Sequence, residues 1–255
     1  MRKKILLTFD LEEFDLPREF AKTISEEDMY NVSLDGLKII LDILKKFNIK
    51  STFFTTANFA NKYPQTIKQI SKNHEIASHG FSHSEPLTIG SIINAKKIKE
   101  EIIHKPLSGF RAPRWQLKNI DILAQAGFKY DSSTHPIYLP GRYNNLKQNK
   151  KIHRRGNIIE IPMSTFPPNF SIFWLAFKNL PLIYSKIFTK LNFLKSNYNM
   201  LIFHPWEFTD LSKFDIPKNI KRIDGTKLSR KLEDYLIFCK KNNYKFETCE
   251  NFLKV

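Results

Sequence analysis

The chain has little cysteine and little glycine, and both shortages narrow what it can be. Its only cysteines, Cys239 and Cys249, lie late and apart, so neither a disulfide framework nor a cysteine-based zinc site is indicated. Eight glycines and 13 prolines are too few for a fibrous or low-complexity protein, and no repeat of fixed period is visible. With 255 residues, 42% of them hydrophobic, the chain can bury a sizeable core as one α/β barrel or two small domains.

Long apolar runs are missing as well. No stretch of about 18 uninterrupted apolar residues exists, so nothing in the sequence is expected to span a membrane. The first residues, Met1–Lys4 followed by Ile5–Leu7, imitate the start of a signal peptide. The apolar run stops at Thr8, however, and no small-residue cleavage site follows. A first strand is the better interpretation, and it predicts a cytoplasmic protein.

Acidic residues are scarce relative to basic ones. The chain has 41 Lys and Arg against 25 Asp and Glu, a net charge of +16, with denser basic patches at 147–155 and 218–231. Solvated helix faces explain most of this charge, and no helix-turn-helix, zinc-finger or RNA-binding aromatic motif is present. We therefore expect no nucleic-acid partner. A basic surface could still hold the protein near anionic lipid or an acidic glycan, so peripheral membrane contact is one expectation.

Strand-like and helix-like segments alternate along the chain. β-Branched and aromatic runs predict strands near 4–9, 51–56, 75–78, 109–111, 128–131, 157–161 and 200–203. Apolar residues at helical spacing predict helices near 33–47, with Ser33 as a candidate N-cap, and near 58–72, 91–104, 117–126 and 226–242. This alternation predicts a parallel α/β barrel, whose active site lies at the carboxyl ends of its strands.

Chemically useful side chains fall at or just past those strand ends. They are Asp10, Glu12, His79, Arg111, Asp131 and His204. His79 and His83 are four positions apart, and neutral imidazole is the commonest metal ligand. Taken alone this spacing more often marks loop histidines, but the shared rim favours a metal site.

Two carboxylates, Asp10 and Glu12, lie two residues apart and face the same side of an extended segment. One of them could complete a His, His, carboxylate set with open positions for water and substrate, and the other could act as general base. Their plain alternative is N-capping or loop solvation. Glu13 is a rival for the ligand role.

Three more residues complete the predicted chemistry. His204 is placed to act as general acid toward a leaving amine. Asp131 could hold the His204 ring, or it could only start a turn with Ser132 and Ser133. Arg111 could orient a carboxylate through two hydrogen bonds, its alternative being a surface salt bridge of small worth.

Five ordered motifs in the chain resemble those of the polysaccharide deacetylases, the NodB-homology or carbohydrate esterase family four group. The motifs are Thr8–Asp10, His79–His83, Arg111–Pro113, Asp131–Ser133 and Leu201–His204, and the likeness extends over about residues 5–248. The resemblance implies a distorted (β/α) barrel, usually seven-stranded, that forms a single catalytic domain over residues 1–255. It also implies metal-dependent removal of N-acetyl groups from amino sugars.

The resemblance further assigns roles by position. Asp10 would be the base, His79 and His83 metal ligands, and His204 the acid. Arg111 would tune Asp10, and Asp131 would assist His204. The backbone N–H near Arg114 would help hold the developing oxyanion. The expected cofactor is a divalent ion, zinc first, with cobalt, nickel or iron as alternatives.

The first motif departs from the common pattern, because Leu11 follows Asp10 and the next acid is Glu12. A subgroup with Asp-x-Glu spacing looks similar, including Glu160–Pro162 and His204–Glu207, and it acts on exported or lipid-linked glycans or on small cyclic amides. Glu12 is therefore the expected third ligand, and Arg114, Trp115 and Trp206 are the expected substrate contacts. Hydrolysis of a C–N bond in a small cyclic amide is the runner-up function, and a non-catalytic carbohydrate-binding barrel is the third.

An unusually apolar segment, 170–188, is interrupted by Lys178 and Pro181. Such a segment is most often a core helix or a cap over the barrel. The alternative is an interfacial patch that faces a membrane, which would suit a lipid-linked sugar substrate.

Overall fold

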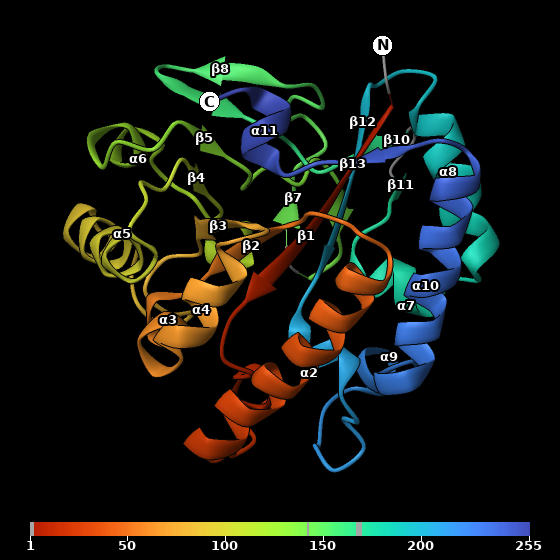
Figure 1. Cartoon of the computed structure of the whole chain (residues 1–255), viewed down its shortest axis with the longest axis horizontal. Coiled ribbons are helices and arrows are strands. Elements are labelled where there is room, and N and C mark those ends of the chain that lie inside the picture. Colours follow the sequence, from red (N-terminus) through yellow and green to blue (C-terminus); the bar gives the residue numbers. More distant parts are fainter. Residues whose placement is uncertain (1–2, 142, 167–169) are drawn as a thin grey trace.

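The computed structural model describes residues 3–141, 143–166 and 170–255. Its central feature is a curved sheet surrounded by helices (Figure 1). Within the described residues, seven strands pair in parallel in the order β12 (Tyr198–Phe203), β1 (Lys4–Leu11), β2 (Thr52–Thr55), β3 (Glu75–Ser78), β4 (Gly109–Phe110), β5 (Tyr130–Asp131) and β9 (Ile158–Glu160). The order confirms the predicted parallel α/β architecture.

Two short strands extend the sheet. β8 (His153–Arg155) pairs antiparallel with β9, and β13 (Lys245–Phe246) pairs in parallel with the start of β1. The gap between β9 and β12 is bridged by side chains, because Tyr198 donates a hydrogen bond to the Pro162 carbonyl at 2.8 Å and Ser164 Oγ accepts one from the Met200 N–H at 2.9 Å. The barrel is thus distorted, as expected.

The helices cover the outside of the sheet (Figure 1). Between the early strands lie α1 (Leu16–Glu19), α2 (Glu26–Lys46), α3 (Ala57–Lys62), α4 (Pro64–Ile70), α5 (Ile89–Ile103), η1 (Pro113–Trp115) and α6 (Asp121–Gln125). The later ones are α7 (Trp174–Asn179), α8 (Leu182–Asn192), η2 (Pro205–Phe208), α9 (Lys218–Lys221), α10 (Gly225–Lys241) and α11 (Cys249–Leu253). None of the described helices is both long and apolar enough to cross a bilayer.

Two helix predictions need correction. α2 begins at Glu26 rather than near residue 33, because Ser25 is its N-cap and accepts a hydrogen bond from the Asp28 N–H. Ser33 is buried inside the helix and caps nothing. The segment predicted as one helix over 58–72 is two helices, since Pro64 starts a new one and disfavours helical geometry at Tyr63.

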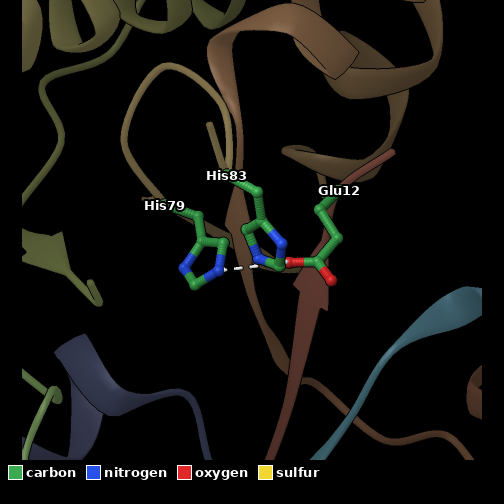
Figure 2. Close-up of side chains that lie close together, drawn as sticks. All are labelled: Glu12, His79 and His83. Carbon is green, nitrogen blue, oxygen red and sulfur yellow. Dashed lines mark ion pairs between the residues drawn. The ribbon is translucent and has the colours of Figure 1, made fainter. Parts of the chain in front are cut away.

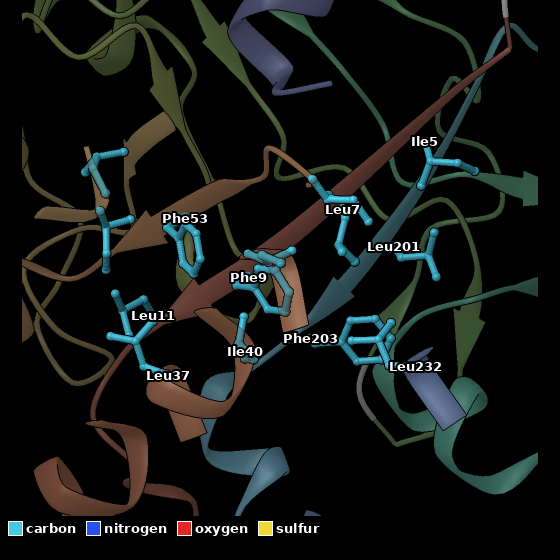
Figure 3. Packing of buried hydrophobic residues seen from close by; sticks show 14 of the residues in the cluster. Ile5, Leu7, Phe9, Leu11, Leu37, Ile40, Phe53, Leu201, Phe203 and Leu232 are labelled. Carbon is cyan, nitrogen blue, oxygen red and sulfur yellow. The ribbon is translucent and has the colours of Figure 1, made fainter. Parts of the chain in front are cut away.

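Strand alternation explains how the barrel positions its polar residues. Ile5, Leu7, Phe9 and Leu11 point outward and pack against helix side chains such as Leu37, Ile40 and Leu232 (Figure 3). Full burial of each such side chain contributes about 1.5–3 kcal/mol. The intervening positions 6, 8, 10 and 12 face inward, so β1 ends with two carboxylates directed toward the barrel axis.

The connections contain structure that the sequence did not predict. Between β5 and β9, β6 (Tyr138–Leu139) pairs antiparallel with β7 (Tyr143–Asn144), and β8 follows. β10 (Thr165–Phe166) and β11 (Phe170–Ser171) pair antiparallel. The apolar segment 170–188 forms β11, α7 and the first part of α8.

Candidate active site

A cleft of about 780 Å³ opens at the carboxyl ends of the strands. Its walls come from the ends of β1, β3 and β12 and from α1, α7 and α9. Eight of the side chains predicted from the sequence line it: Asp10, Glu12, His79, His83, Arg114, Trp115, His204 and Trp206. The other two, Arg111 and Asp131, are fully buried behind the cleft wall.

Glu12, His79 and His83 converge on one point (Figure 2). Glu12 Oε2 lies 3.2 Å from His79 Nε2 and 2.6 Å from His83 Nε2, and the three potential ligand atoms all lie within 4.8 Å of one another. Burial alone would raise the pKa of Glu12. The neighbouring imidazoles of His83 and His204 outweigh burial and hold that pKa well below its usual range. Glu12 is therefore a carboxylate in the working pH range.

In both His79 and His83, the ring nitrogen Nδ1 points away from Glu12 and already has a polar partner. His79 Nδ1 lies 2.9 Å from the Arg111 carbonyl, which can only accept, so Nδ1 carries a proton and Nε2 is the nitrogen directed toward Glu12. His83 Nδ1 lies 3.3 Å from a carboxylate oxygen of Asp15. A carboxylate or carbonyl behind a histidine is the usual support of a metal ligand. No motif in the sequence identified Asp15 as a site residue, although it lies three positions after Glu12.

Glu13 points elsewhere. Its Oε2 accepts a hydrogen bond from Thr56 Oγ1 at 2.7 Å, and burial raises the pKa of its carboxyl. Among the described residues, the group able to hold a metal ion contains Glu12 and not Glu13. The geometry thus separates the two rivals that the sequence left open.

The donor set fits a divalent cation. Two imidazole nitrogens and one carboxylate oxygen on one side of a cleft leave the opposite side open, which is the arrangement of catalytic zinc sites. Glu12 Oε2 is buried, and within the described part of the chain it receives no hydrogen bond of good geometry. A buried carboxylate oxygen is costly without a partner, and a cation between the three groups would supply one.

Asp10 is held by the buried Arg111. Arg111 Nη1 donates to Asp10 Oδ1 at 2.7 Å and to Thr8 Oγ1 at 3.0 Å, and its Nε and Nη2 donate to the carbonyl and hydroxyl of Ser132, each at 3.2 Å. The guanidinium also lies 3.9 Å from the ring centre of Phe54. The second carboxylate oxygen of Asp10, Oδ2, is 3.9 Å from His79 Nε2, beside the histidine cluster.

His204 follows β12, the strand that pairs with β1, and its partner is Glu207. Glu207 Oε1 accepts from the His204 backbone N–H at 2.7 Å and lies 3.0 Å from His204 Nδ1. The ring is stacked on Trp206 at a centroid distance of 4.8 Å and meets Trp174 edge-on at 5.4 Å. Burial would lower the pKa of His204, but the carboxylates of Glu12 and Glu207 outweigh it and raise that pKa.

A buried lysine stands behind Glu207. Lys178 Nζ lies 3.6 Å from Glu207 Oε2, and both side chains are fully buried. Neither of these two atoms has a hydrogen-bond partner in the part of the chain that is described. The ammonium is 5.8 Å and 6.0 Å from the ring centres of Trp174 and Trp206. Sequence reasoning assigned no role to Lys178 or Glu207, although His-Pro-Trp-Glu was part of the subgroup likeness.

Asp131 contacts Ser133 rather than the His204 ring. Its Oδ1 accepts from Ser133 Oγ at 2.5 Å, and Ser133 Oγ in turn accepts from the Ala112 N–H at 2.8 Å. Burial, and next the charge of Glu160, raise the pKa of Asp131 well above its usual value. These contacts match the turn interpretation of Asp131 and connect it to the loop that follows Arg111.

That loop carries two of the three predicted substrate contacts, and the third, Trp206, lies on η2. Arg114 and Trp115 adopt left-handed backbone angles, with φ of 54° and 55°, which cost non-glycine residues of order 1 kcal/mol each. Arg114 Nε binds Glu19 on α1 at 2.8 Å, which joins the two sides of the cleft. Trp115 packs on His135 at 4.6 Å, and Trp206 Nε1 points toward Glu12 Oε1 at 3.4 Å. All three predicted substrate contacts thus face the cleft.

Known proteins share parts of this chain. The polysaccharide deacetylase family model matches residues 1–130. The peptidoglycan-N-acetylmuramic acid deacetylase of Bacillus subtilis is 42% identical over 50 residues, which cover 19% of this chain and 19% of that protein. The peptidoglycan-N-acetylglucosamine deacetylase of Bacillus cereus is 35% identical over 79 residues, or 30% and 28% of the two chains. The chain therefore matches less than a third of the length of these curated relatives.

Solved structures match over nearly the whole chain. A protein of Pseudomonas aeruginosa described as a probable polysaccharide deacetylase superposes with a TM-score of 0.67 at 17% identity, covering 98% of this chain and 89% of that one. Puue allantoinase superposes with the same TM-score at 15% identity, covering 98% and 88%. At such low identity these likenesses concern the fold alone. The family model spans about half of the sequence, and on that basis the chain belongs to the polysaccharide deacetylase family.

Proposed function

We propose that the protein is a metal-dependent hydrolase that removes N-acetyl groups from an amino sugar in a polysaccharide, peptidoglycan or lipid-linked glycan. The observation that carries this proposal is the placement of Glu12, His79 and His83 in one cleft that Asp10 and His204 also line. An amide hydrolase needs a site for the carbonyl, a base for water and an acid for the leaving nitrogen.

Glu12, His79 and His83 would hold the divalent ion, for which zinc is the first candidate. A bound ion of this kind polarises a carbonyl and makes water a better nucleophile near neutral pH. Asp10 would accept the proton of the attacking water. Its ion pair with Arg111 fixes the orientation of the carboxylate, which is needed for a base that acts on a water beside the histidine cluster.

His204 would donate a proton to the departing amine. Its Nδ1 is engaged by Glu207, so the ring presents Nε2 to the cleft. The carboxylate of Glu207 favours the protonated ring, and the flat contact with Trp206 fixes the ring plane. Glu207 thus takes the positioning role that the family resemblance assigned to Asp131.

The loop after Arg111 would bind the developing oxyanion and the sugar. Asp131 and Ser133 hold the Ala112 N–H, and we infer that this fixes the strained turn at Arg114 so that its backbone N–H can face the oxyanion. Trp115 and Trp206 offer apolar faces in the cleft for sugar rings. The supporting observation is that a polar floor and aromatic walls share one cavity.

Acetate release from a substrate panel tests this proposal. Purified protein supplied with zinc is incubated with N-acetylglucosamine oligomers, peptidoglycan and, for comparison, the cyclic ureide allantoin. We expect acetate from at least one acetylated glycan and no turnover of allantoin. Allantoin hydrolysis without acetate release would replace the proposal with the cyclic-amide alternative, because that C–N bond needs the same base and acid. No turnover of any substrate by zinc-loaded protein would favour a non-catalytic carbohydrate-binding barrel.

A further inference from the structure

The outer face of α8 is apolar and exposed. We call the α8 stripe the six residues Leu180, Ile183, Tyr184, Ile187, Leu191 and Leu194. Ile183 and Tyr184 are each 56% exposed, Ile187 is 47% exposed and Leu194 is 75% exposed. Ile183, Tyr184, Ile187 and Leu191 lie along one side of α8, and Leu180 and Leu194 flank its two ends. A stripe of this kind is unusual on a surface that meets only water.

The opposite face of the same helix is largely polar. Ser185, Thr189 and Asn192 are buried together with Phe188. Thr189 Oγ1 lies 2.6 Å from the Tyr235 hydroxyl, and Asn192 Nδ2 donates to the Tyr198 carbonyl at 2.8 Å. A helix packed on a protein core normally buries its apolar side. α8 instead buries three polar side chains and leaves most of its apolar side chains outside.

The charged residues of α8 and of the segments that flank it in sequence have one sign. No Asp or Glu occurs between Glu160 and Glu207, whereas Lys186, Lys190 and Lys195 occur in or just after α8. Lys186 Nζ and Lys190 Nζ each lie 5.8 Å from the Phe238 ring, so both stand on the border of the stripe beside α10. The helix thus combines an apolar face with a basic flank, as interfacial helices do.

We propose that the α8 stripe docks on the surface of an anionic membrane. Acidic headgroups complement the lysines, and the acyl boundary accepts the isoleucine and leucine side chains with Tyr184 at the interface. A second copy of the chain would bring the same basic flank against itself, which disfavours that occupant. The net charge of +16 acts in the same direction as the stripe.

Docking on this face would bring the cleft close to the membrane. Trp174 and Leu175 on α7 line the cleft, and the stripe begins only five residues later. Figure 1 places α7 between α8 and α9, and Asn179 Nδ2 on α7 donates to the Asn219 carbonyl on α9 at 2.8 Å. For the proposed deacetylase, this position favours a glycan attached to a lipid as the substrate. That extension rests on the proposed function, whereas the membrane docking does not depend on it.

Vesicle co-sedimentation tests the docking. Wild-type protein is compared with Ile183→Ser/Ile187→Ser and with Ile93→Ser, a matched control whose isoleucine is also 47% exposed but lies on α5. The vesicles contain either phosphatidylcholine alone or phosphatidylcholine with 30% phosphatidylglycerol, and each kind is used at low and at high salt. We expect wild type and the control to bind anionic vesicles at low salt and the double variant to bind at least tenfold more weakly. Neutral vesicles should bind little of any variant.

Three results would overturn the proposal. They are no binding of wild type to anionic vesicles at low salt, equal binding by the double variant, and a wild-type dimer in light scattering that the double variant abolishes without any vesicle binding. Thermal unfolding of each variant checks the fold. Acetate release from soluble oligomers should be the same in all three proteins, so that a failure of docking and a failure of the deacetylase proposal are told apart.

Discussion

Two buried cations stand behind the two proposed proton-transfer residues, and they are held in opposite ways. On the base side, Arg111 donates hydrogen bonds to Asp10, Thr8 and Ser132. On the acid side, Lys178 makes no hydrogen bond among the described residues and reaches Glu207 only as an ion pair at 3.6 Å.

The difference follows from the chemistry of the two side chains. A guanidinium presents five donors in a fixed plane and can satisfy several acceptors of a rigid strand end at once. An ammonium is a point charge, and burial lowers the pKa of Lys178 although Glu207 opposes that effect. The base side is therefore a rigid network, whereas the acid side depends on a single charge pair.

The largest effect is expected on the base side. Asp10→Asn removes the proton acceptor but keeps the shape of the side chain, and we expect kcat to fall by about 10³-fold. KM should change little, because Asp10 acts on water rather than on the sugar. Steady-state acetate release measures both constants. Retention of more than a tenth of the wild-type kcat would show that another group is the base.

A smaller effect is expected from Glu207→Gln on the acid side. The amide can still accept from the His204 backbone N–H, but it no longer favours the protonated ring, and we expect kcat to fall by about 10²-fold. The alkaline limb of the kcat profile should also move to lower pH. Glu207→Asp is the conservative comparison. An unchanged pH profile would reduce Glu207 to a purely structural residue.

The charge pair itself is tested by a double-mutant cycle in thermal or denaturant unfolding. Lys178→Met leaves Glu207 buried without its cation and should cost about 3 kcal/mol of unfolding free energy. Glu207→Gln should cost a similar amount by stranding the lysine. The double variant should lie within about 1 kcal/mol of wild type, since an apolar replacement of a buried pair is often neutral. Additive losses would contradict the pairing.

The last expected effect is on the pH dependence of stability, and it concerns His135, behind the base side. Burial, and next the charge of Arg111, lower the pKa of His135 from 6.5 to about 3. Below pH 6.5 the unfolded chain takes up a proton on His135 that the folded protein does not. The folded protein is therefore at full stability with respect to this group above pH 6.5 and loses stability as the pH falls toward 3.

We therefore expect wild type to lose about 3 kcal/mol more stability than His135→Gln between pH 6.5 and pH 4. Denaturant unfolding at both pH values measures the difference. Glutamine retains a donor and an acceptor for Tyr143 and Ser171, which hold the histidine ring. Equal acid sensitivity in the two proteins would show that the ring is charged in the native state.

The base side could be predicted from sequence because its residues sit at fixed places on strands. Asp10 and Glu12 share a face by strand periodicity, and His79 follows directly on β3, so the parallel order brings them together. Arg111 follows the neighbouring strand β4 in the same way. The parallel barrel itself was predictable from the alternation of elements, although helix starts at Ser25 and Pro64 were not.

The acid side could not be predicted in the same way. Lys178 lies on the short helix α7, 29 residues before Glu207, and their contact depends on how α7 folds back over η2. No local sequence pattern predicts that Lys178 and Glu207 come into contact. Asp15 behind His83 and the Ser133 link to Ala112 are likewise long-range contacts that only the folded chain defines. The apolar segment 170–188 was predictable as apolar, but not which of its faces would be buried.

The identity of the carboxylate ligand is the central claim, and metal content tests it most directly. Wild type, Glu12→Gln and the adjacent control Glu13→Gln are stripped with a chelator, reloaded with zinc, desalted and assayed by elemental analysis. Since Glu12 faces both histidines and Glu13 does not, we predict one zinc per chain in wild type and Glu13→Gln, and loss of zinc from Glu12→Gln. Zinc retained by Glu12→Gln but lost from Glu13→Gln, or no zinc in wild type, would contradict the account.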